Sequence, residues 1–373
     1  MPLSSTSSTA SRPWNNVEQL LQNLLERHIV PGCALSVRYK GEEIYTFAGG
    51  EAEQRPNQRN VTIDTIWDLA SITKVLCTSH LYLKWINDEL FSVESTLAEA
   101  LDGVAKDITL GDCLSHSSGY ENWRPLYSKY IHEQEKWGQE SIRQDMYQRA
   151  YTTAPIAPRQ TIYKYSDLGF LALGAYAERR FGKPIHVLWE EFLPTMAKTG
   201  LYWGHPHAAA TEDCPVRRRV VVGEVHDLHA AVLGGKAPHA GLFGSVSALT
   251  NVAHWSVNAY HGRSNDIDAE TIRHFWAYRG AGSHCLGWDT PSPQGSSASS
   301  LWPKNGVGHL GFTGTSLWIA PDQELIVGFA SNRVHPIVEG GALPGVPASP
   351  RFKAFQQFRP QLHQAILETL QYT

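Results

Sequence analysis

The stretch "DLASITKVLCT", residues 68–78, places a serine and a lysine three positions apart in an otherwise apolar run. Residues at this spacing lie one turn apart on an α-helix, so Ser71 and Lys74 are expected to share one helix face. Apolar residues on nearly every side predict that this turn is buried. A buried lysine needs a partner or a lowered pKa, and a desolvated lysine can activate a serine hydroxyl as a nucleophile.

This Ser-x-x-Lys motif occurs once in the chain, and a single motif of this kind is also typical of an ordinary helix surface. Its meaning therefore depends on the rest of the sequence. The chain has 373 residues, which fits two lobes or one elaborate domain, and its 42% hydrophobic content predicts a substantial core. A net charge of −4 gives no electrostatic case for binding nucleic acid or an acidic membrane surface.

Cysteine usage and the N-terminus bear on the compartment. The five cysteines are scattered and never form a CxxC pair, which is typical of a reducing compartment and argues against a disulfide framework or a zinc site. The N-terminal residues "MPLSSTSSTASRPWNN" contain no apolar stretch, so they are not a signal peptide as they stand, and no segment is long enough to span a membrane. We expect a cytoplasmic protein; a periplasmic one would require that a signal had already been removed.

Hydrophobic periodicity predicts strands near both ends of the chain and helices between them. Residues 33–48 alternate as a β-hairpin does, residues 315–333 read as strand, turn and strand, and residues 351–371 read as a closing helix. We therefore predict an α+β fold in which an antiparallel sheet is flanked by terminal helices. The predicted parts are a disordered lead at 1–13, a sheet lobe from 14–74 and 281–373, and a mostly helical lobe at 75–280. The cleft between such lobes is the expected place for a site.

A second candidate element is "YKYSDLGFLALG", residues 163–174. Tyr165 offers a phenol that could relay a proton beside Lys74, although a core tyrosine at a helix start would give the same pattern. The helix after it is predicted to begin at a Ser/Asp cap and to end at Gly182. A rival Tyr-x-Asn begins at Tyr120, after "LSHSSG". We favour Tyr165 because the strong helix that follows would fix its position.

The third element is "GHLGFTGTSLWIAP", residues 308–321. A glycine-rich edge strand allows a substrate backbone to approach closely and to pair as an added strand. The N–H of Phe312, after Gly311, could join the N–H of Ser71 to form an oxyanion hole. A plain edge strand that contains glycines is the alternative interpretation.

Taken in order, three motifs resemble the SxxK, YxN and KTG signatures of the serine β-lactamase and penicillin-binding-protein superfamily. They are Ser71-x-x-Lys74, Tyr165-Ser166-Asp167 and His309-Leu310-Gly311. The sequence is most similar to the class C-like branch of β-lactamases, D-alanyl-peptidases and esterases. Flanking segments at 114–120, 225–250 and 311–336 also resemble this branch, and the resemblance covers roughly residues 15–370. It implies a β-lactamase/transpeptidase-like fold.

The resemblance also implies a mechanism. Ser71 would attack an acyl carbonyl, while Lys74 and Tyr165 together take and return the proton. The backbone N–H groups of Ser71 and Phe312 would hold the oxyanion, and water would release the acyl group. The expected partner is a small-molecule acyl substrate, which is an ester or, in the alternative, a β-lactam or a D-amino-acid peptide. No metal or organic cofactor is implied.

Two departures from the family pattern affect the expected substrate. Asp167 replaces the usual asparagine, and an ionised carboxylate near Lys74 would favour the charged ammonium and weaken it as a base. His309 replaces the usual lysine, and Leu310 replaces the threonine beside it, with Phe312 at the next position but one. An apolar pair and a titratable imidazole suit a carboxylate poorly. We read this as a preference for small neutral or hydrophobic acyl groups.

The leading hypothesis is a serine carboxylesterase that works through an acyl-enzyme on Ser71. The alternatives are a D-alanyl-D-alanine carboxypeptidase or β-lactamase, and a catalytically silent binding protein or an acyltransferase on the same scaffold. The histidines at 205 and 207 and the pair His226 and His229 do not offer a third ligand at a suitable spacing, so no metal site is expected. His226 and Asp227 are instead expected to hold a loop near the site.

Overall fold

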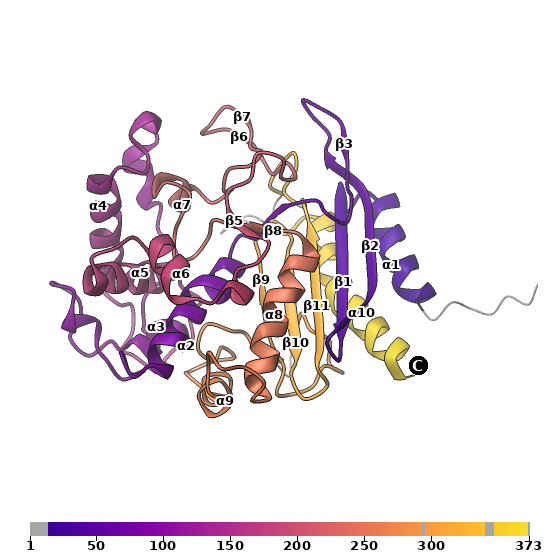
Figure 1. The fold of residues 1–373 in the computed structure, drawn as a ribbon. Helices are drawn as coiled ribbons and strands as arrows, with labels where there is room; N and C mark the ends of the chain where they lie inside the picture. Colours follow the sequence, from indigo (N-terminus) through magenta and orange to yellow (C-terminus); the bar gives the residue numbers. More distant parts are fainter. Residues whose placement is uncertain (1–13, 293–294, 340–346, 372–373) are drawn as a thin grey trace, which may run out of the picture.

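A computed structural model of the chain describes residues 14–292, 295–339 and 347–371. The lead predicted at 1–13 lies outside these residues. Within them, six strands form one antiparallel sheet in the order β3-β2-β1-β11-β10-β9 (Figure 1). These strands are β1 (Gly32–Tyr39), β2 (Glu42–Glu53), β3 (Arg59–Asn60), β9 (Val307–Leu310), β10 (Ser316–Ala320) and β11 (Leu325–Ser331). The two hairpins that the sequence predicts are confirmed, and β1 pairs with β11, so the two ends of the chain form one sheet.

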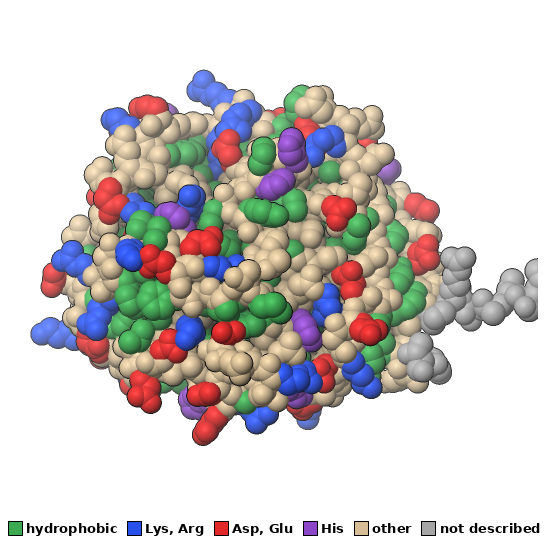
Figure 2. All heavy atoms as spheres, in the orientation of Figure 1, with side chains coloured by type: hydrophobic (Ala, Val, Ile, Leu, Met, Phe, Trp, Pro, Cys, Tyr) green, Lys and Arg blue, Asp and Glu red, His purple; other side chains and the backbone are tan. Residues whose placement is uncertain are grey.

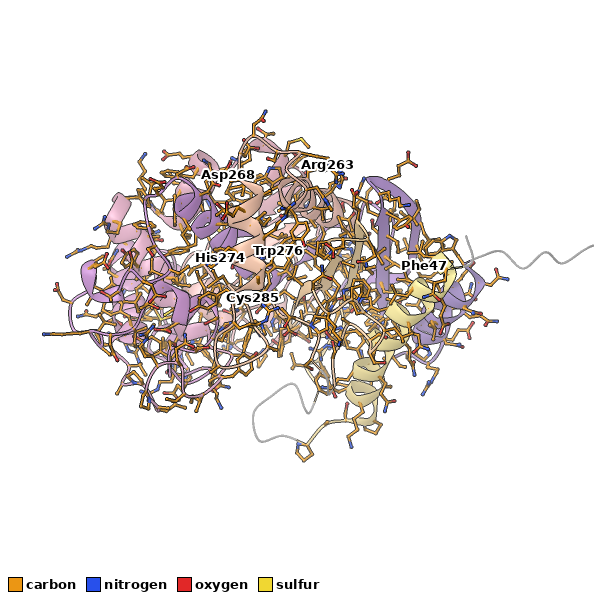
Figure 3. All side chains as sticks on the ribbon, turned by 90° about the horizontal axis from the view of Figure 1, so that it is seen from below. Phe47, Arg263, Asp268, His274, Trp276 and Cys285 are labelled. Carbon is orange, nitrogen blue, oxygen red and sulfur yellow. The ribbon has the colours of Figure 1, made fainter. Side chains whose placement is uncertain are left out.

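Both faces of this sheet are covered by helices. On β11, the side chains of Leu325, Val327 and Phe329 lie in one buried cluster, and those of Ile326 and Ala330 lie in another, as the alternation of a strand requires. The first face packs against α1 (Asn15–Glu26) and α10 (Pro350–Gln371), which also contact each other. Figures 1 and 3 both show these two terminal helices side by side.

The opposite face is covered by α8 (Val246–Tyr260), which contacts β1, β10 and β11. The predicted boundary at residue 280 places this helix in the helical lobe, whereas it packs on the sheet. Gly328 on β11 permits the close approach, because a Cβ there would lie 2.8 Å from Cγ2 of Thr250. This contact joins residues far apart in sequence, which local periodicity does not reveal.

The rest of the chain forms a mostly helical part around the buried α5 (Asp167–Phe181). The helix ends at Gly182, whose φ is +66°, so the predicted start and stop of this helix are confirmed. The other helices of this part are α2 (His80–Asn87), α3 (Leu110–Leu114), α4 (Glu140–Tyr151), α6 (Ile185–Phe192), α7 (Leu228–Val232) and α9 (Ala269–Ala277). Two small sheets complete it among the described residues: β4 (Trp67–Asp68), β8 (Leu242–Gly244) and β5 (Leu201–Trp203), and the pair β6 (Asp213–Cys214) and β7 (Arg219–Val220).

The surface agrees with the near-balanced composition. Acidic and basic side chains are interspersed over the face shown in Figure 2. In the part of the chain that the structure describes, no helix has the length and apolar character needed to cross a bilayer. All five cysteines are buried and unbonded to one another.

Candidate active site

The backbone around Ser71 is tighter than the regular helix expected there. Ala70 has a φ of +48°, and three successive i→i+3 hydrogen bonds follow, the last from the N–H of Lys74 to the carbonyl of Ser71. A π-helix then runs from Lys74 to Ser79 and leads into α2. Left-handed non-glycine residues and π-helical turns both concentrate at functional sites. Ser71 and Lys74 still lie side by side, but Ser71 is on a tight turn and Lys74 begins the π-helix rather than both lying on a regular α-helix.

Long-range hydrogen bonds hold this turn against the edge of the main sheet. Thr313 donates its hydroxyl hydrogen to the carbonyl of Asp68 at 2.7 Å, and Thr315 donates to the carbonyl of Leu69 at 3.2 Å. Gly311 comes so close that a Cβ there would lie 2.6 Å from the Leu69 carbonyl oxygen. The end of β9 and the Ser71 turn are therefore fixed relative to each other.

Asp68 ties a third segment to the same turn. Its buried carboxylate accepts hydrogen bonds from the N–H of Ala70 at 2.8 Å and from the N–H of His226 at 2.6 Å. Burial raises the pKa of this carboxyl, and the two N–H groups oppose that rise. Asp227 contacts Nε2 of His239 at 3.0 Å, so the predicted loop-holding role of His226 and Asp227 agrees with their positions.

Lys74 is fully buried and all its neighbours favour its charged form. Its Nζ lies 3.0 Å from Oγ of Ser71, 2.7 Å from a carboxylate oxygen of Asp167 and 3.4 Å from the carbonyl of His239. Burial alone would lower the pKa of Lys74, but the negative charge of Asp167 and the neighbouring phenol of Tyr165 outweigh it and raise the pKa. Lys74 is therefore an ammonium at neutral pH, as Asp167 led us to expect.

Tyr165 lies beside this pair at the start of α5. The Nζ of Lys74 is 5.0 Å from the centre of its ring. Burial and the charge of Asp167 raise the pKa of Tyr165, whereas Lys74 and a hydrogen bond with Ser71 lower it, and the net direction is upward. The N-cap Ser166 fixes the position, because its Oγ accepts from the N–H of Gly169 at 3.1 Å.

Tyr120, the rival tyrosine, is not part of this arrangement. It is fully buried, and its hydroxyl donates to the carbonyl of Tyr151 at 2.8 Å. Its segment instead supports Tyr165 indirectly, since the N–H of Asp167 donates to the carbonyl of Asn122.

Next to Ser71, a cavity of about 390 Å³ opens along the end of β9. The predicted site residues on its wall are Ser71, Tyr165, His309, Leu310, Gly311 and Phe312. Its other lining residues are His284, Asp289, Arg333, Phe352, Phe355, Gln356 and Arg359. Lys74 and Asp167 do not line the cavity. Lys74 contacts Ser71 on the cavity wall, and Asp167 contacts Lys74 from behind it.

The backbone supplies donors at the same place. Among the described residues, no acceptor bonds the N–H of Ser71 or that of Phe312. The threonine contacts described above hold these two segments together. Two such donors beside a nucleophile are what an oxyanion hole requires.

Sequence reasoning missed two histidines beside the cavity. His116 and His284 join His309 in a cluster in which one ring nitrogen of each histidine lies within 4.8 Å of those of the other two. Burial lowers the pKa of His284 to about 4 and that of the other two well below the usual value, so all three imidazoles are neutral. His309 therefore supplies no cation where the family has a lysine. His116 stands in the "LSHSSG" segment, but no spacing in the sequence pointed to His284.

The bonding of this cluster does not fit a metal. Nδ1 of His116 accepts the N–H of Ser166 at 3.0 Å, so the proton of the neutral ring lies on Nε2. A neutral imidazole in this tautomer has no lone pair to offer there. The positive charge of Lys74 also acts on all three rings.

A second group of side chains, formed by Asp227, His229 and His239, also uses its polar atoms for hydrogen bonds within the protein. Nε2 of His229 accepts the N–H of Leu126 at 3.1 Å. One oxygen of Asp227 accepts from the N–H of Ala230 at 2.8 Å as well as facing His239. These bonds connect α7 with the segments that precede it and follow it.

Comparison with known proteins agrees with this geometry. The chain is 27% identical to N-acetylmuramyl-L-alanine amidase of Bacillus subtilis (strain 168), over 91% of this chain and 86% of that protein. It is 24% identical to a putative D-alanyl-D-alanine carboxypeptidase of Escherichia coli (strain K12), over 88% and 86%.

Solved structures share the fold. EstCE1, described as a hydrolase with promiscuous acyltransferase activity, superposes with a TM-score of 0.71 at 16% identity, covering 95% of this chain and 98% of that one. A class C β-lactamase superposes with a TM-score of 0.68 at 17% identity, covering 96% and 99%. The family model described as "Beta-lactamase" matches residues 17–346, and the chain therefore belongs to the β-lactamase family.

Proposed function

We propose that this protein is a serine hydrolase that forms an acyl-enzyme on Ser71 and that its substrates are carboxylic esters. The observation that carries the proposal is the 3.0 Å contact between Oγ of Ser71 and Nζ of the buried Lys74 at the wall of a cavity. The names of its relatives, an amidase, a carboxypeptidase and a hydrolase, support chemistry at an acyl carbon.

The reaction follows from the positions of these groups. Oγ of Ser71 attacks the carbonyl carbon and gives its proton to the Lys74–Tyr165 pair, while the N–H groups of Ser71 and Phe312 stabilise the oxyanion. The bond to the leaving alcohol then breaks, and the alcohol takes up the proton. Attack by water on the acyl-enzyme releases the carboxylic acid and restores Ser71.

The same pair favours esters over amides. Because the pKa values of Lys74 and Tyr165 are both raised, the pair holds its protons at neutral pH and is a poor acceptor there. Esters have a better leaving group and need less help from an acid or base than amides do. The neutral His309 and the apolar Leu310 give no cation for a β-lactam carboxylate at the position where the family has a lysine.

A panel of substrates tests this proposal. We expect wild-type protein to hydrolyse p-nitrophenyl butyrate with a kcat/KM at least about tenfold above that for nitrocefin and for a peptide ending in D-Ala-D-Ala. Faster turnover of nitrocefin or of the peptide would replace the esterase with a β-lactamase or a carboxypeptidase. No turnover of any of the three, with no labelling by a fluorescent penicillin, would favour a silent binding protein.

Asp167→Asn should shift the pH dependence of ester hydrolysis to lower pH. The carboxylate of Asp167 raises the pKa of Lys74, so removing its charge lowers that pKa and increases the fraction of free amine at neutral pH. An opposite charge at this distance changes a pKa by about 1–3 units. We therefore expect the alkaline rise of kcat/KM to move down by about that amount, with a rate gain of about tenfold or more at pH 7.

Asp88→Asn is the matched control, since it breaks a lysine–aspartate pair with Lys84 on α2, away from the cavity. Its pH profile should coincide with that of the wild type. If Asp167→Asn leaves the profile in place as well, the Lys74–Asp167 pair does not control the proton acceptor. The ion pair between Lys74 and Asp167 stabilises the folded state below the pKa that lysine has in the unfolded chain, and this stabilisation is lost as pH rises through the raised pKa of Lys74. Thermal melts of both variants are therefore needed at each pH.

A further inference from the structure

His284 is a buried side chain on the cavity wall that the proposed chemistry does not use. It stands in the loop after α9 and lines the cavity together with Ser71 and Tyr165. Only 5% of it is exposed. Its ring centre lies 5.8 Å from that of Tyr165 and 6.0 Å from that of His309. An imidazole is thus present in the cavity where an acyl group on Ser71 would lie.

Contacts with distant segments fix the loop that carries His284. The N–H of Asp289 donates to the carbonyl of Gly308 on β9 at 2.8 Å, and the N–H of Gly308 donates to the carbonyl of Asp289 at 2.9 Å. The N–H of Gly287 donates to the carbonyl of Leu114 on α3 at 2.9 Å. These bonds hold the loop between the edge strand and the helical part, so the imidazole has a fixed place beside the cavity.

The groups around Nδ1 determine which nitrogen of His284 carries the proton. Nδ1 lies 2.8 Å from the hydroxyl of Tyr163, 3.4 Å from Oγ of Ser283 and 3.4 Å from a carboxylate oxygen of Asp289. Ser283 donates its hydroxyl hydrogen to that carboxylate oxygen at 2.7 Å, so the oxygens of Ser283 and Asp289 can only accept from Nδ1. Two such oxygens favour the tautomer with the proton on Nδ1.

The other nitrogen of the ring, Nε2, therefore has a free lone pair. Among the described residues it has no hydrogen-bond partner, and it is not sealed from the cavity. The other two histidines of the cluster differ in this respect, because His116 carries its proton on Nε2 and Nε2 of His309 is buried. Of these three imidazoles, only that of His284 offers the cavity a proton acceptor.

The water that releases the acyl group needs such an acceptor. The Lys74–Tyr165 pair holds its protons at neutral pH, so it provides little base for this second step. We propose that His284 is the general base for that water and that Asp289 and Tyr163 are positioning residues for its ring. The inference rests on the proposed function and assigns its second step.

The release step moves one proton from water to Ser71. Nε2 of His284 takes a proton from the water while the water oxygen forms a bond to the acyl carbon, and the N–H groups of Ser71 and Phe312 stabilise the oxyanion. When the bond between that carbon and Oγ of Ser71 breaks, its electron pair stays on Oγ, which takes a proton from the phenol of Tyr165. The proton on His284 then replaces the one that Tyr165 has given up, and the carboxylic acid leaves.

The charge state of His284 is compatible with this role. Burial and the charge of Lys74 lower the pKa of His284 to about 4, against the opposing effect of Asp289. The other titratable side chains in contact with its ring are Tyr163, Tyr165, His116 and His309. The imidazole is neutral at neutral pH and can accept a proton. Deacylation should therefore slow as pH falls through about 4, because His284 then becomes charged.

We expect His284→Gln protein to accumulate the acyl-enzyme. Mixed with p-nitrophenyl butyrate, it should release a burst of about one p-nitrophenol per protein at the wild-type rate, because acylation does not need His284. The steady-state kcat should then be about 10²- to 10⁴-fold below wild type, the range typical of a lost general base. The KM should fall with it, so that kcat/KM stays within about threefold of wild type. Stopped-flow absorbance measures both phases.

Hydroxylamine separates a lost base from a damaged site. It is a stronger nucleophile than water and attacks without a general base, so it should release the butyryl group from His284→Gln and from wild type at similar rates. Asp289→Asn should also keep the burst and slow the steady state, because an amide can donate to Nδ1 and favour the other tautomer.

His274→Gln is the matched control, since His274, labelled in Figure 3, is an exposed histidine on α9 that does not line the cavity. Its burst and its steady-state rate should equal those of the wild type. A steady-state rate of His284→Gln within about threefold of wild type would overturn the inference and leave the hydrolase standing. Loss of the burst in His284→Gln protein that melts as the wild type does would also overturn it, because His284 would then act in acylation. If the wild type releases no p-nitrophenol, the proposed function fails and the inference fails with it.

Discussion

Ser71→Ala should lower kcat for p-nitrophenyl butyrate by about 10⁴-fold or more, because removing an acyl-enzyme nucleophile leaves only binding and oxyanion stabilisation. The KM should change little, since the cavity wall keeps its other residues. The fold should persist, because the Ser71 side chain is partly exposed and its turn is held by Asp68, Thr313 and Thr315. Stopped assays with a thermal melt of each sample measure both effects.

Ser92→Ala provides the control, since Ser92 is an exposed serine on a turn that does not line the cavity. Its rate should match that of the wild type. Ester hydrolysis within about tenfold of wild type in Ser71→Ala would show that another group is the nucleophile.

Tyr165→Phe should lower kcat/KM for the same ester by about 10²- to 10⁴-fold, the range typical of a positioned general acid or base. Its phenol interacts with both Lys74 and Ser71, so its loss removes one half of the proton acceptor. With Lys74 held as an ammonium by Asp167, little free amine remains to replace it at neutral pH.

Tyr120→Phe is the matched comparison, because the sequence offered it as an equivalent motif. Its hydroxyl donates to the carbonyl of Tyr151 in the core. Removing it deprives that partly buried carbonyl of this donor, which we expect to cost about 0.5–1.5 kcal/mol of stability with no large change in rate. A Tyr120→Phe enzyme that loses activity while Tyr165→Phe keeps it would reverse our assignment of the two tyrosines.

Local sequence signals account for much of the fold and for the polar part of the site. The cap at Ser166 and the stop at Gly182 predict α5 and thereby the position of Tyr165. The glycine-rich segment predicts the edge strand β9, and the family pattern connects Gly311 with Ser71. The substitution at Asp167 predicts an acidic partner for Lys74, and the two side chains lie 2.7 Å apart.

Other features depend on contacts between distant segments and leave no local pattern. The left-handed backbone of Ala70 and the π-helix after it are held by Asp68 and the strand hairpin, so the sequence alone indicated a regular helix. The packing of α8 on the sheet depends on the close contact between Gly328 on β11 and Thr250 on α8. Arg359 lies on an ordinary closing helix in the sequence, and only its packing brings it to the cavity.

The acyl-enzyme itself is the most direct test of this account. Wild-type protein mixed with p-nitrophenyl butyrate and quenched in acid during turnover should gain the mass of one butyryl group, and peptide mapping should place that group on Ser71. Ser71→Ala should show no adduct under the same conditions. Ester turnover without any adduct at Ser71, or an adduct on another residue that persists in Ser71→Ala, would show that Ser71 is not the nucleophile.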